Sequence, residues 1–190
     1  MSNHIHNSIA FFCDDNRLTE ILEAIQHDND GTNTKYGIGT IDFNKIIPVS
    51  NPDDKDDAWN TRCNAFHCSY YGNRVIFFDT ANTPPYPIVE KLAEMFNDIK
   101  ISYLWNGDYF TNYCGEAHYE NGSLISSVCY QYMDVTIKVP PELGYPGNKY
   151  GLVFAPEMFG IDRNDKAAIE AYVMKSAVES AEQLADKHNS

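Results

Sequence analysis

The chain has 190 residues, 43% of them hydrophobic and 13% aromatic, a composition that suits one packed domain of ordinary size and excludes a disordered chain. Its 27 acidic residues outnumber 14 basic ones, and the formal net charge of -13 disfavours direct binding to nucleic-acid phosphates. No run of about 18 apolar residues is present, so no membrane-spanning segment is expected.

The N-terminal residues and the cysteines both bear on the cellular compartment. Residues 1–7 lack the basic start and the apolar stretch of a signal peptide. The cysteines are odd in number and lack the tight spacing of a disulfide framework or a zinc knuckle: Cys13, Cys63, Cys68, Cys114 and Cys129. We therefore expect a cytoplasmic protein with no cofactor and no membrane association.

The first two predicted elements are a strand and a helix. The strand runs from Ile5 to Cys13, and alternation places every second side chain on one face: Ile5, Asn7, Ile9 and Phe11. Asp14 or Asp15 is expected to cap a helix that ends near Asp28. Its apolar stripe follows helical spacing: Leu18, Ile21, Leu22 and Ile25.

A pair of strands is predicted in the middle of the chain, after the apolar segment Ile41–Pro48 and a charged loop. The strands Ala65–Tyr71 and Arg74–Thr80 flank Gly72-Asn73, a dipeptide that suits a two-residue turn. The second strand is apolar on both faces, which is typical of the interior of a sheet.

The proline-rich segment Thr83–Pro87 separates this hairpin from the next helix. A residue before proline avoids the helical region, so the helix is expected to begin at Pro87 rather than at Tyr86. It should extend to about Asn97 with Ile88, Leu92, Met95 and Phe96 buried. A strand follows at Ile99–Trp105, and Asn112–Glu120 and Ser123–Gln131 form a hairpin around Asn121-Gly122.

The order of these elements predicts an α+β fold of the ferredoxin-like, split βαβ type, with both helices on one face of an antiparallel sheet and an added hairpin. This domain is expected to cover residues 1–132. Residues 133–190 form a C-terminal extension, packed on the same domain, with strands near Val135–Val139 and Gly151–Ala155. It ends in a helix from Asp162 to about Lys187, capped by Asp162 or Asn164, with these residues on its buried side: Ile169, Val173, Ala177, Ala181 and Leu184.

Five blocks of this sequence, in this order, resemble the YubB-type ferredoxin-like domain family. They are Asn3–Ile5 followed by Asn7, Ile41–Pro48, Trp59–Ala65, Phe78–Pro85, and the hairpin that contains Gly115, Tyr119, Asn121 and Gly122. The family is found on bacterial plasmids, phages and integrative elements. The resemblance implies a ferredoxin-like fold and a mobile-element context, and it implies no particular activity.

Several side chains have types that can support chemistry. His4 and His6 lie two apart on a strand and face the same side, as a metal pair would, but the sequence identifies no third ligand. Cys63 with His67 or His118 has the composition of a thiol nucleophile and its base. A free cysteine more often packs as a small apolar residue. We therefore predict no metal site and no catalytic residue.

A candidate binding surface is expected at one end of the sheet. The start of one hairpin strand lies beside the end of the other, and the proline-rich loop that follows is stiff. The residues expected there are Trp59, Asn64, Asp79, Thr80, Pro84, Pro85 and Tyr86. They form either a small core that closes the sheet end, with Trp59 buried, or a shallow recognition pocket with Trp59 or Tyr86 partly exposed as an aromatic anchor.

The expected function is a non-enzymatic protein-interaction module of a mobile genetic element. Its partner is expected to be a protein, and the acidic surface favours a basic one. Two alternatives remain open: a small enzyme that uses Cys63 or Asp79, and an acidic mimic of nucleic acid that acts on a DNA-binding protein. No oligomeric state is predicted.

Overall fold

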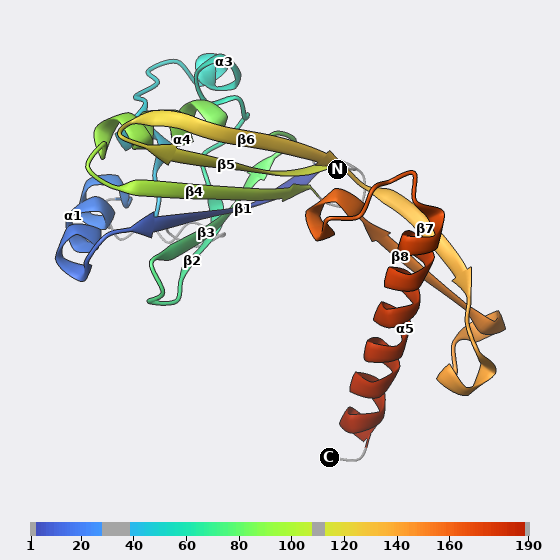
Figure 1. The fold of residues 1–190 in the computed structure, drawn as a ribbon. Coiled ribbons are helices and arrows are strands. Elements are labelled where there is room, and N and C mark those ends of the chain that lie inside the picture. The colour runs from blue at the N-terminus through green and yellow to red at the C-terminus, as the bar shows by residue number, and fades with distance from the viewer. Residues whose placement is uncertain (1–2, 28–38, 108–112, 189–190) are drawn as a thin grey trace. The chain divides into compact units, whose positions relative to one another are not determined.

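A computed structural model describes residues 3–27, 39–107 and 113–188 (Figure 1). The chain forms two compact units, residues 1–129 and 130–190. In the described part of the chain, no helix combines the length and apolar character that crossing a membrane requires.

The first unit is built on a six-stranded sheet with the strand order β2-β3-β1-β4-β5-β6 (Figure 1). Its strands are β1 (His4–Phe12), β2 (Phe66–Tyr70), β3 (Val75–Ala81), β4 (Lys100–Gly107), β5 (Tyr113–Glu120) and β6 (Ser123–Gln131). Its helices are α1 (Asp15–Ile25), α2 (Phe43–Ile46), α3 (Lys55–Trp59) and α4 (Tyr86–Met95). Strand β1 pairs antiparallel with both β3 and β4. The α+β, ferredoxin-like fold is thereby confirmed.

Helices α1 and α4 pack on the same face of this sheet. Leu18 and Ile21 of α1 share one core with Ile88 and Leu92 of α4. The alternation predicted for β1 is also present, because Ile5, Asn7, Ile9 and Phe11 are all buried. On the other face, Phe12 is 62% exposed and Leu104 is 45% exposed. The helices therefore cover one side of the sheet and leave large apolar side chains accessible on the other.

A buried polar network lies inside this core. The Asn7 side-chain amide donates hydrogen bonds to the carbonyl oxygens of Ile5 and Phe78 and to Oγ1 of Thr80, at 2.8, 3.3 and 3.1 Å. The Tyr103 hydroxyl donates to Oδ1 of Asn7 at 2.7 Å, and burial holds the pKa of Tyr103 well above its usual value. Asn7 therefore joins β1, β3 and β4 through one satisfied amide.

The first hairpin is longer than the two-residue turn expected at Gly72-Asn73. Tyr70 pairs with Ile76, which leaves five residues between the paired positions. Gly72 and Arg74 both have positive φ, 76° and 62°. The chain therefore reverses direction through Gly72 and Arg74. The expected two-residue turn would have reversed it through Gly72 and Asn73.

Helix α4 differs from its prediction in both its start and its buried face. It begins at Tyr86, one residue before Pro87. Proline is tolerated there because the first N–H groups of a helix have no intrahelical partner. Val89 and Ala93 are buried and Met95 is exposed. The buried stripe is thus rotated toward the 88–89–92–93 side, which contacts the sheet.

The end of α1 also differs slightly from its prediction. The helix ends at Ile25, where the N–H of Gln26 still donates to Leu22 O. The predicted end at Asp28 lies outside the described residues. Asp14 accepts a hydrogen bond from the Arg17 N–H, so Asp14 is the N-cap of the two candidates.

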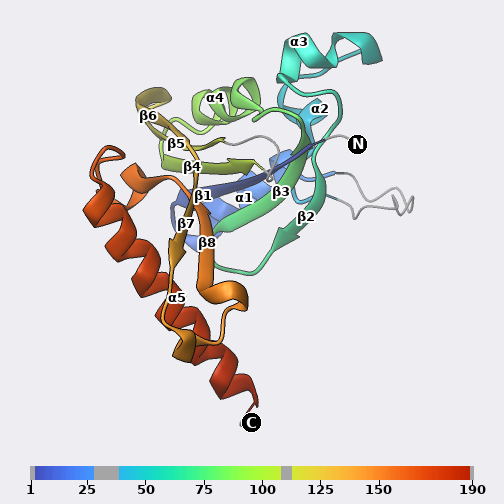
Figure 2. The ribbon, with the colours of Figure 1, turned by 90° about the vertical axis from the view of Figure 1, so that its right-hand side faces the viewer.

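The second unit combines a two-stranded antiparallel sheet with one long helix (Figure 2). Its elements are β7 (Met133–Lys138), β8 (Lys149–Phe154) and α5 (Lys166–His188). Phe154, Ile169 and Val173 form its small core. Short 3-10 helices cover Pro141–Leu143, Pro146–Asn148 and Pro156–Phe159.

Two details predicted for the C-terminal helix are wrong. Asp165 caps it, since its carboxylate accepts the Ala168 N–H at 3.0 Å, whereas Asp162 bonds to the Asn164 N–H one turn earlier. Leu184 is exposed rather than buried. A six-residue strand spans roughly 20 Å and a 23-residue helix about 34 Å, so the last turns of α5 extend past the sheet.

Candidate functional site

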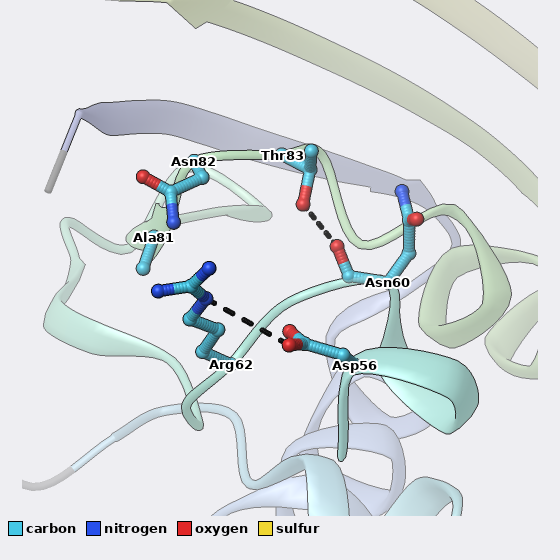
Figure 3. Close-up of a pocket in the computed structure, with 6 residues that line it drawn as sticks. All are labelled: Asp56, Asn60, Arg62, Ala81, Asn82 and Thr83. Atoms are coloured by element: carbon cyan, nitrogen blue, oxygen red, sulfur yellow. Dashed lines mark hydrogen bonds and ion pairs between the residues drawn. The ribbon is translucent and has the colours of Figure 1, made fainter. Parts of the chain in front are cut away.

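A shallow pocket of about 240 Å³ lies where β3 ends and the chain returns from α3 (Figure 3). Below, it is called the loop pocket. It is lined by Asp56, Asn60, Arg62, Ala81, Asn82 and Thr83. One wall therefore comes from residues 56–62 and the opposite wall from residues 81–83.

Three hydrogen bonds lock the two walls of the loop pocket. The Thr83 hydroxyl donates to the backbone carbonyl of Asn60 (Figure 3). The Asn60 side-chain amide donates to Pro84 O at 2.8 Å, and the buried Thr61 hydroxyl donates to Ala81 O at 3.0 Å. Because backbone acceptors are used on both sides, the pocket walls are fixed relative to one another.

Two asparagines shape the pocket through their backbone conformation. Asn60 ends α3 with φ 58°, and Asn82 follows β3 with φ 69°. Asparagine accepts this left-handed region more readily than most residues. The Asn82 N–H donates to Asn3 O at 2.7 Å, and the Asn82 side chain accepts from the Asn3 N–H at 3.3 Å. The turn at Asn82 is therefore tied to the start of β1.

The surroundings of the loop pocket are acidic. Four carboxylates on the segment before and within α3 are exposed: Asp53, Asp54, Asp56 and Asp57. Arg62 is the cation of the pocket wall; its side chain is 73% exposed and its Nε lies 3.7 Å from Asp56 Oδ2. Lys55 places its ammonium group 5.3 Å from the ring centre of Trp59. Residues 53–62 therefore carry a net negative charge, because their four carboxylates outnumber their two cations.

A second group of polar side chains gathers on the helix-free face of the sheet. We call it the His–Asp cluster; it contains His4, His6, His67 and Asp79. Nδ1 of His6 lies 2.7 Å from Asp79 Oδ1, and Nδ1 of His67 lies 2.9 Å from Asp79 Oδ2. Nδ1 of His4 lies 3.9 Å from Asp79 Oδ2. Ligand atoms of His4, His67 and Asp79 all lie within 4.8 Å of one another, a separation that a metal ion can bridge.

Strand pairing and a β-bulge assemble the His–Asp cluster. Asp79 pairs with His6 on one side and with Phe66 on the other. The β2–β3 register then shifts between Phe66 and Ser69, and His67 has φ 50°. The bulge turns the His67 side chain toward Asp79. Regular alternation would have placed His67 on the face opposite that of Phe66, so strand alternation alone does not predict that His67 lies beside His4.

Two of the predicted binding residues are structural. Trp59 is fully buried, packs edge-on against Phe43, and donates its indole N–H to Ile47 O at 2.9 Å. Asn64 accepts from the N–H groups of Phe43 and Ala65 and donates to a carboxylate oxygen of Asp42. These contacts correspond to the alternative of a small core that closes the sheet end.

The remaining predicted residues lie at the same sheet end but do not form one exposed surface. Thr80 is buried and donates to Thr83 O at 2.9 Å, and Pro85 is also buried. The half-buried Tyr86 accepts from Trp105 Nε1 at 2.7 Å. Pro84 is half-buried at the pocket rim, where it accepts from Asn60. Asp79 points to the opposite face, into the His–Asp cluster.

Most residues of the loop pocket lie in two of the sequence blocks described above, Trp59–Ala65 and Phe78–Pro85, but neither block indicates a ligand. Asn60, Arg62, Asn82 and Thr83 are polar residues in two short connecting segments separated by a hairpin. A preference of asparagine for left-handed turns was the one local signal available. That signal predicts the turns, and the antiparallel pairing of β2 with β3 is what places the two segments at the same end of the sheet, as the hairpin geometry predicted.

The environments of the half-buried cysteines do not favour a reactive thiol. Burial raises the pKa of Cys63 above its usual value. Burial also raises the pKa of Cys68 to about 11. Because the thiolate is the nucleophile, a raised pKa lowers the reactive fraction at neutral pH.

A comparison with known protein families finds a match in the middle of the chain. Residues 57–136 match the family described as "Ferredoxin-like domain in Api92-like protein". This segment is less than half of the chain; it includes β2 to β6 and excludes β1, which lies between β3 and β4 in the sheet. No curated protein and no solved structure gives a significant match. Over residues 57–136, the chain is thus similar to the ferredoxin-like domain of Api92-like proteins.

Proposed function

We propose that the chain is a non-enzymatic protein-interaction module whose loop pocket receives a basic segment of a partner protein. The observation that carries this proposal is a pocket with locked walls beside four exposed carboxylates. The occupant to which we commit is a lysine- or arginine-containing stretch of polypeptide.

The rigidity of the loop pocket supports binding. Its walls are already joined by hydrogen bonds from Thr83, Asn60 and Thr61. A partner therefore does not have to order these loops, and the entropy cost of association is reduced.

The charge near the pocket supports a basic occupant. Exposed carboxylates attract cationic side chains and increase the rate of encounter. Arg62 does not block this use, because an exposed ion pair at 3.7 Å is weak and its long side chain can turn toward solvent. Asp56 then becomes available to an incoming lysine or arginine.

The finer identity and setting of the protein are part of the same proposal. The order of the five sequence blocks supports membership of the YubB-type family and a mobile genetic element as the context. The five cysteines form no disulfide, which fits a reducing cytoplasm.

The proposal is tested with labelled ten-residue peptides and fluorescence anisotropy on the full chain. A peptide rich in Lys and Arg should bind with a Kd of roughly 100 µM or tighter, and an acidic peptide of equal length should not. Replacing Asp56 and Asp57 with Asn should weaken binding by about tenfold or more. Amide NMR shifts should concentrate in residues 56–62 and 81–83.

The matched control is the double variant Asp134→Asn, Glu142→Gln, which removes the same charge from exposed positions of the second unit. It should bind the basic peptide as the unmodified chain does. Equal loss of binding in both double variants would show that net charge, and not the loop pocket, attracts the peptide. That result, or no binding of basic peptides, overturns the proposal.

A further inference from the structure

We propose that the His–Asp cluster is a binding site for one divalent transition-metal ion, with His4, His67 and Asp79 as ligands and His6 as the residue that orients Asp79. The site would join three strands on the helix-free face of the sheet. This inference does not depend on the proposed function, since the residues of the loop pocket take no part in it.

The two oxygens of Asp79 have different partners, and this divides the roles. Oδ1 lies 2.7 Å from His6 Nδ1, whereas Oδ2 lies near both His67 and His4, at 2.9 and 3.9 Å. Oδ2 is therefore the oxygen that faces two imidazole nitrogens. A metal-bound carboxylate is commonly held by a further hydrogen bond, which His6 can provide through Oδ1.

The two distances from Asp79 to its proposed partner ligands require only small adjustments to accept an ion, and the ligand atoms of His4 and His67 lie within 4.8 Å of each other. Zinc–ligand bonds of 2.0–2.1 Å in a tetrahedral site place neighbouring ligand atoms about 3.3 Å apart. The His4–Asp79 separation of 3.9 Å exceeds this value and the His67–Asp79 separation of 2.9 Å falls below it, each by well under 1 Å. The His4 and His67 side chains are partly exposed and can make these shifts by rotation about their side-chain bonds.

The backbone places His67 in an uncommon conformation that serves this arrangement. A residue with a Cβ rarely adopts φ 50°, and here the left-handed residue is the one that reaches Asp79. Aromatic contacts also position the imidazoles: the Phe66 ring lies 5.1 Å from that of His4 and 5.0 Å from that of His67, both nearly perpendicular. The two proposed imidazole ligands therefore pack against the same phenyl ring.

The donor set indicates which ions fit. Two imidazoles and one carboxylate suit zinc, iron, nickel and copper rather than calcium or magnesium, which prefer oxygen ligands. Three protein ligands leave a coordination position for water or for a side chain of another molecule. The Asp79 side chain is only 13% exposed, so the carboxylate is well shielded while the imidazoles remain reachable from solvent.

The test measures binding of the metal alone to the full chain after chelator treatment and dialysis. Titration with Zn²⁺, followed by calorimetry, should show one equivalent per chain with a Kd of roughly 10 µM or tighter. Cobalt(II) in its place should give a visible absorption band that reports coordination by the imidazoles. At a hundredfold excess over Kd, the melting temperature of the first unit should rise by roughly 5 °C or more.

Variants then assign the ligands. His67→Gln and His4→Gln should each weaken Zn²⁺ binding at least about tenfold and abolish the cobalt band. The matched control is His118→Gln, because His118 lies 3.7 Å from Glu116 on the same face of the sheet without being part of the cluster. It should leave affinity and spectrum unchanged.

The outcomes that would contradict the metal site differ between the three variants. If His67→Gln disturbs the bulge and the fold, circular dichroism will show the change. His4→Gln, at the first residue of β1, then serves as the variant that tests the ligand assignment. The proposal is overturned if Zn²⁺ does not bind, or if the bound equivalent persists with unchanged affinity in a folded His4→Gln chain. Loss of binding in His118→Gln equal to that in His4→Gln would likewise overturn it.

Discussion

The buried contact between Asn7 and Tyr103 is expected to be one of the most sensitive points of the first unit. Asn7 accepts from the Tyr103 hydroxyl and donates to Thr80, which in turn donates to Thr83 in the wall of the loop pocket. Removing the Asn7 amide should therefore destabilise the core and loosen the pocket together.

The magnitude follows from the burial of both partners. Asn7→Ala leaves the fully buried Tyr103 hydroxyl without its acceptor, which costs about 1–3 kcal/mol. The lost amide hydrogen bonds and the small cavity bring the expected total to roughly 3 kcal/mol. Tyr103→Phe should cost about 1–2 kcal/mol, because it leaves Oδ1 of Asn7 unpaired. The loss of stability in the double variant should be smaller than the sum of the two single losses, by about 1 kcal/mol or more. The reason is that each change removes the group that the other leaves unsatisfied.

The assay is urea unfolding followed by tryptophan fluorescence. The protein has two tryptophans, Trp59 and Trp105, and both are buried in the first unit, so the signal reports this unit alone. Tyr71→Phe is the control, because Tyr71 is 76% exposed and its change should stay within about 0.5 kcal/mol. A total loss below about 1 kcal/mol for Asn7→Ala, or strict additivity with Tyr103→Phe, would refute the network as drawn.

Three further predictions concern packing and pH. Tyr86→Phe should cost about 1 kcal/mol and Tyr86→Ala about 2–4 kcal/mol in urea unfolding, because the hydroxyl accepts from Trp105 and the ring packs on it. Gly115→Ala should destabilise the protein by about 1–3 kcal/mol, because the new Cβ would lie 2.6 Å from a backbone carbonyl oxygen of β6. Gly151→Ala is the control and should cause only a small loss of stability, because its new Cβ would have its nearest neighbour 3.4 Å away. Thermal melts followed by circular dichroism compare the two variants. Burial raises the pKa of Cys68 from 9.0 to about 11. The neutral thiol therefore stabilises the fold below pH 9, and this contribution is lost as the pH rises to 11. The decline in unfolding free energy between pH 9 and pH 11 should be smaller in Cys68→Ala.

Local patterns in the sequence were enough to predict most elements of the first unit. Side chains on a strand alternate regardless of what packs on them, so the buried set of β1 followed directly from residues 5–11. The Asn121-Gly122 turn was equally local, and both residues have the positive φ, 52° and 74°, that a tight hairpin needs. The order of the elements along the chain then predicted the ferredoxin-like sheet, because that order limits which strands can be neighbours.

The candidate sites depended on contacts that no local pattern contains. His67 reaches Asp79 through a bulge, and a bulge arises from the pairing of two strands rather than from either sequence alone. The buried stripe of α4 was rotated away from Met95 because the sheet, not the helix, decides which side is covered. The loop pocket exists because Asn60 and Thr83, 23 residues apart, are bonded across two turns. Strand alternation and turn preference are properties of a few consecutive residues, whereas a site is a property of segments that meet only after the chain has folded.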